Sequence, residues 1–204
     1  MTKIKICGLT SPADVACVNA AKPDFCGFVI DFPKSRRSVS PRQVRTLVRD
    51  LDRAVLPVGV FVDAPMEEVA ALLQEGTIAV AQLHGHESET YLTALRRLAP
   101  GHTIWQAFQL YTSADGEQAL ASSADCLVLD SGQGSGKTFD WSLIPRTDRP
   151  FLLAGGLTPG SLDAAIRTVR PWGVDLSSGV ETEGRKDPEK IAAAVAAVRK
   201  EESL

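Results

Sequence analysis

The chain has 204 residues, of which 44% are hydrophobic and 23% charged, an ordinary composition for a globular protein. Its formal net charge of −3 offers no basic surface to a polyanion, so we expect no nucleic-acid partner and expect any anionic ligand to be held by local groups. No uninterrupted apolar run approaches the ~18 residues that a membrane span needs, so we expect no membrane residence. Residues 1–204 are interpreted as one domain.

The cysteines and the start of the chain indicate a cytoplasmic protein. Cys7, Cys17, Cys26 and Cys126 are scattered without paired spacing, which favours reduced thiols over a disulfide framework or a zinc site. The first residues lack the apolar stretch and small-residue cleavage site of a secretory signal. We therefore expect a cytoplasmic location.

The first element is a strand over Lys3–Cys7, in which lysine and cysteine alternate with isoleucine. Because successive side chains of a strand face opposite ways, Ile4 and Ile6 share an apolar face, and Lys5 and Cys7 share the other. A glycine and a capped helix start follow at once. Cys7 is therefore expected at the carboxyl end of a first βα unit, where parallel α/β folds place their active sites.

Strands and amphipathic helices alternate along the rest of the chain. Helix starts are marked by a capping side chain before a proline at Ser11-Pro12, Ser40-Pro41, Thr158-Pro159 and Asp187-Pro188, and more loosely at Asp63-Ala64-Pro65. Apolar residues recur with helical spacing at Val44, Leu47, Val48 and Leu51, at Leu162, Ala165, Ile166 and Val169, and at Ile191, Val195 and Val198. Besides the first, strands are predicted over Phe25–Ile30, Val55–Val62, Ile78–His84, Thr103–Phe108, Cys126–Asp130, Phe151–Ala154 and Val174–Ser177.

Eight strands with helical crossovers predict an α/β fold, a single (β/α)8 TIM barrel that is compact beside the ~250 residues typical of that fold. An open, doubly wound parallel sheet is the alternative. One repeat is weak, because only residues 139–144 stand between a glycine-rich loop and Pro145. We therefore expect helix six to be a stub.

Polar groups follow each predicted strand, where a barrel carries its functional residues. They are Cys7-Gly8, Asp31 with Lys34-Ser35-Arg36-Arg37, Asp63, Gln82 with His84-Gly85, Gln106, Asp130, Gly155-Gly156, and Asp175 with Ser177-Ser178-Gly179. The glycine and serine turns after strands seven and eight bring backbone N–H groups and hydroxyls together, as barrels do to bind phosphate. Phosphate binding is therefore predicted for Gly155, Gly156, Ser177, Ser178 and Gly179.

The run Gly134–Thr138 resembles a P-loop, but Ser131 stands where that motif needs its first glycine, and Pro145 leaves no room for the long helix that must follow. We expect instead a loop, with Gly134, Gly136 and Lys137, that closes over a ligand.

A metal site at His84 and His86 would lack further ligands, since the only other histidine, His102, precedes a strand at the opposite end of the barrel. We therefore expect no metal, and a hydrogen-bonding His84 at the barrel mouth.

Cys7 and Asp130 remain as a possible base and acid. Each ends its strand and faces inward, which suits a thiol base opposite a carboxylic acid. At its unperturbed pKa of ~8.5 a thiol is only slightly ionised near neutral pH, so a catalytic Cys7 needs help, which the charge of Lys5 on the same face could supply. The alternative is a buried structural thiol.

Taken in order, these motifs match a known family. They are Lys5–Thr10, Gly27–Val29, Pro33–Arg37, Val58–Val62, Gln82–Gly85, Leu129-Asp130, Gly134–Trp141, Ala154–Leu157 and Asp175–Glu181. The chain resembles the phosphoribosylanthranilate isomerases of tryptophan biosynthesis from end to end. No single motif is decisive, but their order and spacing together are highly specific.

The resemblance implies a cofactor-free (β/α)8 isomerase that performs an Amadori rearrangement on a small phosphorylated aminosugar. By position, the general base falls on Cys7 and the general acid on Asp130. Substrate binding is expected from Lys5, Arg37, Gln82, His84 and Asp175. A monomer or a homodimer is expected.

Three alternatives stay open at this point. Another ribose-phosphate barrel would carry its own catalytic lysine, carboxylates or metal ligands. A sugar-phosphate-binding module without activity would keep the glycine and serine turns but could lose the acid or the base. A P-loop nucleotide switch would bind ATP through Lys137.

Overall fold

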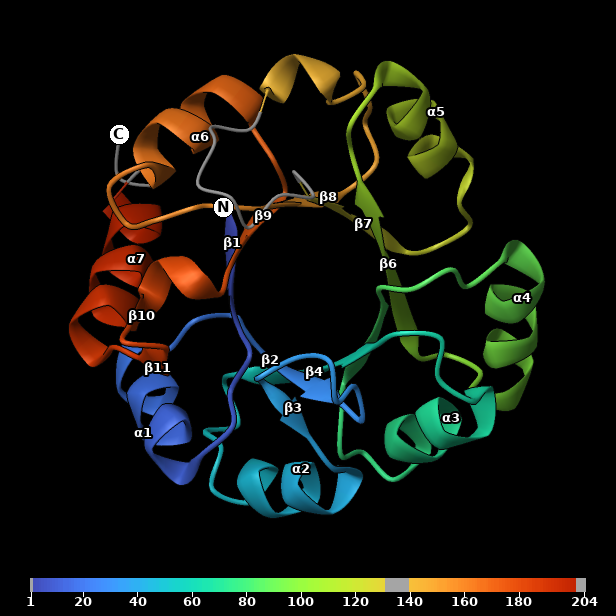
Figure 1. The fold of residues 1–204 in the computed structure, drawn as a ribbon, viewed down its shortest axis with the longest axis horizontal. Helices are drawn as coiled ribbons and strands as arrows, with labels where there is room; N and C mark the ends of the chain where they lie inside the picture. The colour runs from blue at the N-terminus through green and yellow to red at the C-terminus, as the bar shows by residue number, and fades with distance from the viewer. Residues whose placement is uncertain (1, 131–139, 201–204) are drawn as a thin grey trace.

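The computed structural model describes residues 2–130 and 140–200. Eight parallel strands close into a barrel surrounded by helices (Figure 1). They are β1 (Lys3–Cys7), β2 (Phe25–Ile30), β4 (Leu56–Phe61), β5 (Val80–Leu83), β6 (Thr103–Gln109), β7 (Cys126–Asp130), β8 (Phe151–Ala154) and β9 (Gly173–Leu176). Because β1 pairs with both β2 and β9, the sheet is closed, which confirms the barrel and rules out the open sheet.

The helices occupy the crossovers, as the alternation predicts. They are α1 (Pro12–Ala21), α2 (Pro41–Val48), α3 (Met66–Gln74), α4 (Glu89–Leu98), α5 (Ser113–Ala121), α6 (Leu162–Val169) and α7 (Pro188–Lys200). Ser11 and Ser40 each form a capping box in front of a proline, as predicted, since each hydroxyl accepts a backbone N–H three residues ahead. The described part of the crossover after β7 holds only a 3₁₀ turn, η1 (Trp141–Leu143), so the sixth helical position is a stub.

The predicted helix start at Thr158-Pro159 is wrong by three residues. Thr158 and Ser161 bond each other instead, with the Thr158 N–H donating to the Ser161 hydroxyl and the Ser161 N–H donating to the Thr158 carbonyl, both over 3.0 Å. These bonds close a separate turn, and α6 begins only at Leu162.

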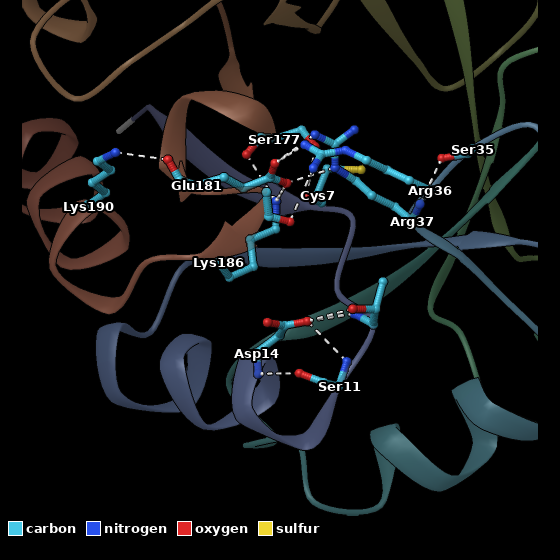
Figure 2. A network of polar contacts seen from close by, with 12 residues as sticks. Cys7, Ser11, Asp14, Ser35, Arg36, Arg37, Ser177, Glu181, Lys186 and Lys190 are labelled. Atoms are coloured by element: carbon cyan, nitrogen blue, oxygen red, sulfur yellow. Dashed lines mark hydrogen bonds and ion pairs between the residues drawn. The ribbon is translucent and has the colours of Figure 1, made fainter.

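Short elements that the sequence analysis did not anticipate lie at the carboxyl end of the barrel. The two-residue strand β3 (Ser38–Val39) adds to β2. After β9 come a 3₁₀ turn, η2 (Ser178–Val180), and a hairpin of β10 (Glu181–Thr182) and β11 (Arg185–Lys186). These elements place the basic loop after β2 against the loop after β9, beside the site described below (Figure 2).

The core has two layers that follow the strand alternation. Ile4 and Ile6 of β1 are fully buried in a large cluster between the barrel and its helices. The barrel interior holds a second cluster from the opposite strand faces: Phe25, Val58, Val80, Trp105, Cys126, Val128, Leu152 and Ala154. Among the described residues, none of the helices combines the length and apolar character needed to cross a lipid bilayer.

Candidate active site

A cavity of about 300 Å³ opens at the carboxyl ends of the barrel strands, where the sequence predicted the site. We call it the site cavity. Eleven predicted site residues line it: Cys7, Arg37, Gln82, His84, Asp130, Gly155, Gly156, Asp175, Ser177, Ser178 and Gly179. The predicted loop residues Gly134, Gly136 and Lys137 lie outside the described residues.

Cys7 ends β1 at the floor of this cavity, beside the fully buried Lys5. Gly27 of β2 makes room for both, because a Cβ there would lie 2.7 Å from the Cys7 Sγ and 3.0 Å from the Lys5 Cε. Burial raises the pKa of the Cys7 thiol, the nearby charge of Lys5 lowers it, and Asp175 raises it again; the net shift is upward. Lys5 therefore promotes the ionisation of Cys7 less than the sequence suggested.

Lys5 forms a buried ion pair with Asp175 of β9, with 2.6 Å between the Lys5 Nζ and the Asp175 Oδ2. Burial opposes the charge of Lys5, but Asp175 and Cys7 together raise its pKa, so the lysine stays charged. Lys5 has no exposed surface and does not line the cavity. The other oxygen, Asp175 Oδ1, is buried without a hydrogen-bond partner among the described residues, which leaves it free to accept a bond from a bound ligand.

Asp130 is the last residue of β7 and is partly exposed to the cavity. Its backbone carbonyl accepts the Leu110 N–H over 2.9 Å, which fixes the strand end. In the sheet, β9 and β8 separate β7 from β1. Asp130 and Cys7 therefore reach the cavity from separate strands, an arrangement that would let an acid and a base act on two sides of one ligand.

Gln82 and His84 of β5 form a second polar pair in the cavity wall. The Gln82 amide nitrogen lies 3.2 Å from the His84 Nδ1, and its amide oxygen is buried with no partner among the described residues. Burial lowers the pKa of His84, so the ring is a neutral hydrogen-bonding group near neutral pH.

The turns after β8 and β9 meet at one side of the cavity. Gly155 and Gly156 have φ values of 91° and 66°, which favour glycine. Gly179 allows the turns to touch, because a Cβ there would lie 1.8 Å from the Leu157 carbonyl oxygen. The Ser177 hydroxyl donates to the Cys7 carbonyl over 3.1 Å, which ties these turns to the end of β1.

The basic loop after β2 is held by a carboxylate on the β10–β11 hairpin (Figure 2). Arg37 bonds Glu181 through two nitrogens, with Nε to Oε1 at 2.7 Å and Nη2 to Oε2 at 2.9 Å. Arg36 and Lys186 also bond Glu181. Burial opposes the charge of Glu181, but the bonds from Arg37 and Lys186 lower its pKa to about 2. Burial lowers the pKa of Lys186, against the pull of Glu181.

Comparisons with known proteins identify the family of this chain. Residues 4–197 match the family model described as N-(5'phosphoribosyl)anthranilate (PRA) isomerase. A relative from Lacticaseibacillus paracasei, named N-(5'-phosphoribosyl)anthranilate isomerase, is 43% identical over 193 residues that cover 94% of this chain and 92% of the relative. The chain belongs to the N-(5'-phosphoribosyl)anthranilate isomerase family.

Solved isomerase structures have the same fold over almost the whole chain. The phosphoribosylanthranilate isomerase of Thermotoga maritima aligns with a TM-score of 0.87 and 35% identity, covering 98% of this chain and 100% of that one. A second isomerase structure, in complex with reduced 1-(o-carboxyphenylamino)-1-deoxyribulose 5-phosphate, aligns with a TM-score of 0.82 and 31% identity over 98% and 100% of the two chains. A third, with a TM-score of 0.83, 33% identity and coverage of 98% and 100%, is described as monomers generated from the dimeric Thermotoga maritima enzyme.

Three residues in or beside the site cavity are not among the predicted site residues: Gln109, Glu181 and Lys186. Gln109 lines the cavity because β6 continues one residue past the predicted end at Phe108. Glu181 was noted only as part of a motif, and Lys186 not at all. The signal for their hairpin is Glu183-Gly184, whose positive φ values of 50° and 78° make a two-residue turn.

Three of the polar residues noted at the ends of the predicted strands do not line the site cavity. Asp31 is exposed, Asp63 pairs with the exposed His86 across 3.1 Å, and Gln106 is buried in bonds to the Glu87 carbonyl and the Ser122 hydroxyl. Within residues 2–130 and 140–200, no three or more histidine, cysteine or acidic side chains are grouped so that they could hold a metal ion.

Proposed function

We propose that this chain is an N-(5'-phosphoribosyl)anthranilate isomerase of tryptophan biosynthesis. It converts N-(5-phospho-β-D-ribosyl)anthranilate to 1-(2-carboxyphenylamino)-1-deoxy-D-ribulose 5-phosphate by an Amadori rearrangement. The observation that carries the proposal is one cavity that gathers Cys7, Asp130, Arg37 and the paired glycine and serine turns. The relative whose structure holds the reduced form of this product supports the choice of substrate.

We infer that the two ends of the substrate are bound at opposite sides of the cavity. The phosphate lies at Gly155, Gly156, Ser177, Ser178 and Gly179, where backbone N–H groups and hydroxyls supply hydrogen bonds. The anthranilate carboxylate lies at Arg37, whose planar guanidinium suits a carboxylate better than an ammonium group does.

The first chemical step opens the ribose ring. Asp130, acting as a general acid, gives its proton to the furanose ring oxygen. The bond between that oxygen and C1 breaks, and the lone pair of the anthranilate nitrogen forms a C=N bond to C1. The intermediate is an open-chain protonated Schiff base, whose positive nitrogen makes the proton on C2 more acidic.

The second step moves the C2 proton. The Cys7 thiolate removes it, and the electrons of the C–H bond form a C1=C2 double bond while the C=N electrons return to nitrogen. The resulting enolamine gains a proton at C1 and loses one from its C2 hydroxyl, which gives the ketone. Cys7 is hard to ionise but a strong base once ionised, because burial raises its pKa.

The remaining predicted residues orient the substrate. Asp175 accepts a hydrogen bond from the anthranilate amine through its unpartnered Oδ1, and Lys5 acts indirectly by holding Asp175 and Cys7. Gln82 and His84 hydrogen-bond the sugar from the cavity wall. We further propose a cytoplasmic monomer or homodimer that binds this small phosphorylated aminosugar and neither nucleic acid nor membrane.

The experiment is turnover of freshly made phosphoribosylanthranilate, followed by the fluorescence that is lost as it rearranges. We expect saturable turnover by the purified protein, without added metal or redox cofactor. A folded protein without turnover would overturn the proposal. ATP binding that depends on Lys137, measured by titration, would favour a nucleotide switch instead.

A further inference from the structure

Arg37 stands between two cavities. Besides the site cavity, it lines a second one of about 300 Å³, bounded by Gly8, Thr10, Asp14 and the β10–β11 hairpin; we call this the side cavity. The stem of Arg37 lies across Gly8, where a Cβ would be 2.3 Å from the Arg37 Cδ. Because open space lies on both sides and arginine is long and flexible, packing alone does not fix the guanidinium.

Glu181 supplies the missing restraint. Its carboxylate is 5% exposed and accepts from both Nε and Nη2 of Arg37, so the two planar groups are held edge to edge. Within residues 2–130 and 140–200, the side-chain hydrogen bonds of Arg37 lie along this one edge. The edge at Nη1 therefore stays available to a carboxylate in the site cavity.

Glu181 is itself held in place from several directions (Figure 2). Lys186, directly opposite in the hairpin, donates to the Glu181 Oε1 over 2.8 Å and to the Ser177 carbonyl over 3.0 Å. Lys190 of α7 donates to the Glu181 backbone carbonyl over 2.8 Å. The carboxylate is therefore a fixed point between the loop after β2 and the turn after β9.

Glu181 and the basic side chains bonded to it carry a net positive charge. One buried carboxylate meets three cations, Arg36, Arg37 and Lys186. It therefore cancels only part of their charge, and Arg37 keeps an attraction for an anion. Arg36 is the outer member, with 55% of its side chain exposed, and it lines the side cavity only.

We propose that Glu181 is a positioning residue, which holds the Arg37 guanidinium at the wall of the site cavity so that its free edge meets the carboxylate of the substrate. Without this carboxylate the guanidinium also occupies the side cavity, and part of the binding energy is lost in ordering it. The inference rests on the proposed function for the identity of the ligand.

The test combines Glu181→Gln with Arg37→Ala in a double-mutant cycle. The readouts are KM and kcat for phosphoribosylanthranilate, and the Kd of reduced 1-(o-carboxyphenylamino)-1-deoxyribulose 5-phosphate. We expect Glu181→Gln to raise KM and Kd about tenfold with kcat within about threefold. In the Arg37→Ala background, the same change should alter KM and Kd less than about twofold, because no guanidinium is left to position. If the changes in KM and Kd caused by the two single substitutions multiply in the double variant, Glu181 has a merely structural role and the inference is overturned.

Two further variants keep the test decisive. Glu183→Gln, at the exposed hairpin turn, is the matched control and should leave KM unchanged. Glu181→Asp keeps the charge that Lys186 needs but is one methylene shorter, so it tests the reach to Arg37 if Glu181→Gln does not fold. Unchanged KM and Kd in a folded Glu181 variant would refute the inference, whereas a wild type that neither turns over the substrate nor binds the analogue would refute the proposed function.

Discussion

Cys7 lies where the family motif places a base, but its thiol is harder to ionise than an ordinary cysteine. The sequence suggested that Lys5 would promote its ionisation, and the two side chains are indeed neighbours. However, Asp175 lies 2.6 Å from the same ammonium group, and burial of the thiol outweighs the remaining attraction. The free site therefore holds a neutral thiol near pH 7. In the proposed mechanism, the base is the small fraction of Cys7 that is ionised at that pH.

We expect Cys7→Ser and Asp130→Asn each to lower kcat by at least the ~10²-fold that a general acid or base contributes, with KM changed much less. A serine hydroxyl is far harder to ionise than a thiol, and asparagine has no carboxylic proton to give. Single-turnover rates measure the chemical step directly. Cys17→Ser, on α1 away from the cavity, is the control and should keep the wild-type rate. Normal chemistry in both folded site variants would sink the assignment, and loss in only one would assign the other role elsewhere.

The pH dependence follows from the direction of the Cys7 shift. Because its pKa is raised in the folded protein, the thiolate forms only as the pH passes above the ordinary thiol value of ~8.5. We therefore expect kcat/KM to rise with pH up to a midpoint above ~8.5, as far as the acid stays protonated in the complex. A pH profile of the free enzyme measures this, and the rising limb should vanish in Cys7→Ser. A midpoint well below ~8.5 would mean that a different group is the base.

At the scale of the elements, the turns after β8 and β9 contain glycines that are needed for two different reasons. Gly179 was predicted to bind phosphate, and it lines the cavity, but its lack of a Cβ is also what lets its turn pack on the Leu157 carbonyl. Gly156 is different, because a Cβ there would meet nothing within 4 Å. Its empty side is where a ligand can approach the backbone closely.

Gly156→Ala should therefore raise KM for the phosphorylated substrate severalfold, since the new methyl group keeps the phosphate away from the N–H groups. The φ value of 66° also strains an alanine, by about 1 kcal/mol. Gly76→Ala is a matched control, because Gly76 has a φ value of 69°, equally empty surroundings and a place after α3, away from the cavity. Steady-state kinetics and urea unfolding separate the effects: both variants lose stability, and only Gly156→Ala loses affinity. An equal KM in both would place the phosphate elsewhere.

Local patterns predicted helix starts where one capping bond decides, and they failed where a competing local turn or a contact between distant residues decides. Ser11 and Ser40 cap their helices as predicted, because a hydroxyl and a backbone N–H three residues apart need nothing else. Thr158 carries the same motif, but its bonds to Ser161 close a turn first. The bond between Arg37 and Glu181 joins residues 144 apart, so no local pattern in the sequence could indicate it.

At the scale of the whole molecule, alternating strands and helices were enough to predict the barrel, and barrel closure then placed the strand ends together. Eleven predicted site residues meet in one cavity for that reason. The burial of Lys5 follows from the same closure, because β1 faces inward between β2 and β9 and its side chain is enclosed. The alternation of side chains along β1 predicted which face Lys5 lies on, but not that its side chain would be fully buried.

The two ends of the barrel differ in what their side chains do: one end carries the site cavity, and the other carries packed aromatic rings. The site lies where the strands end, while three aromatic rings gather where they begin: Phe25 and Trp105 have centroids 4.9 Å apart, and Trp172 lies 6.0 Å from Trp105. Trp105 is 2% exposed inside the barrel. This end supplies packing and no residue of the site cavity.

Trp105→Ala should therefore lower the free energy of unfolding by about 3–5 kcal/mol, as expected for a large aromatic side chain removed from a packed core, and leave kcat and KM within about twofold at temperatures where the variant is folded. Leu98→Ala, which removes a side chain that is already 40% exposed, is the control and should cost less than about 1 kcal/mol. Urea unfolding and steady-state kinetics on the same samples give both quantities. If folded Trp105→Ala lost turnover in proportion to its stability, the packing at the beginning of the strands would be setting the geometry at their ends, and the two ends would have to be treated as one unit.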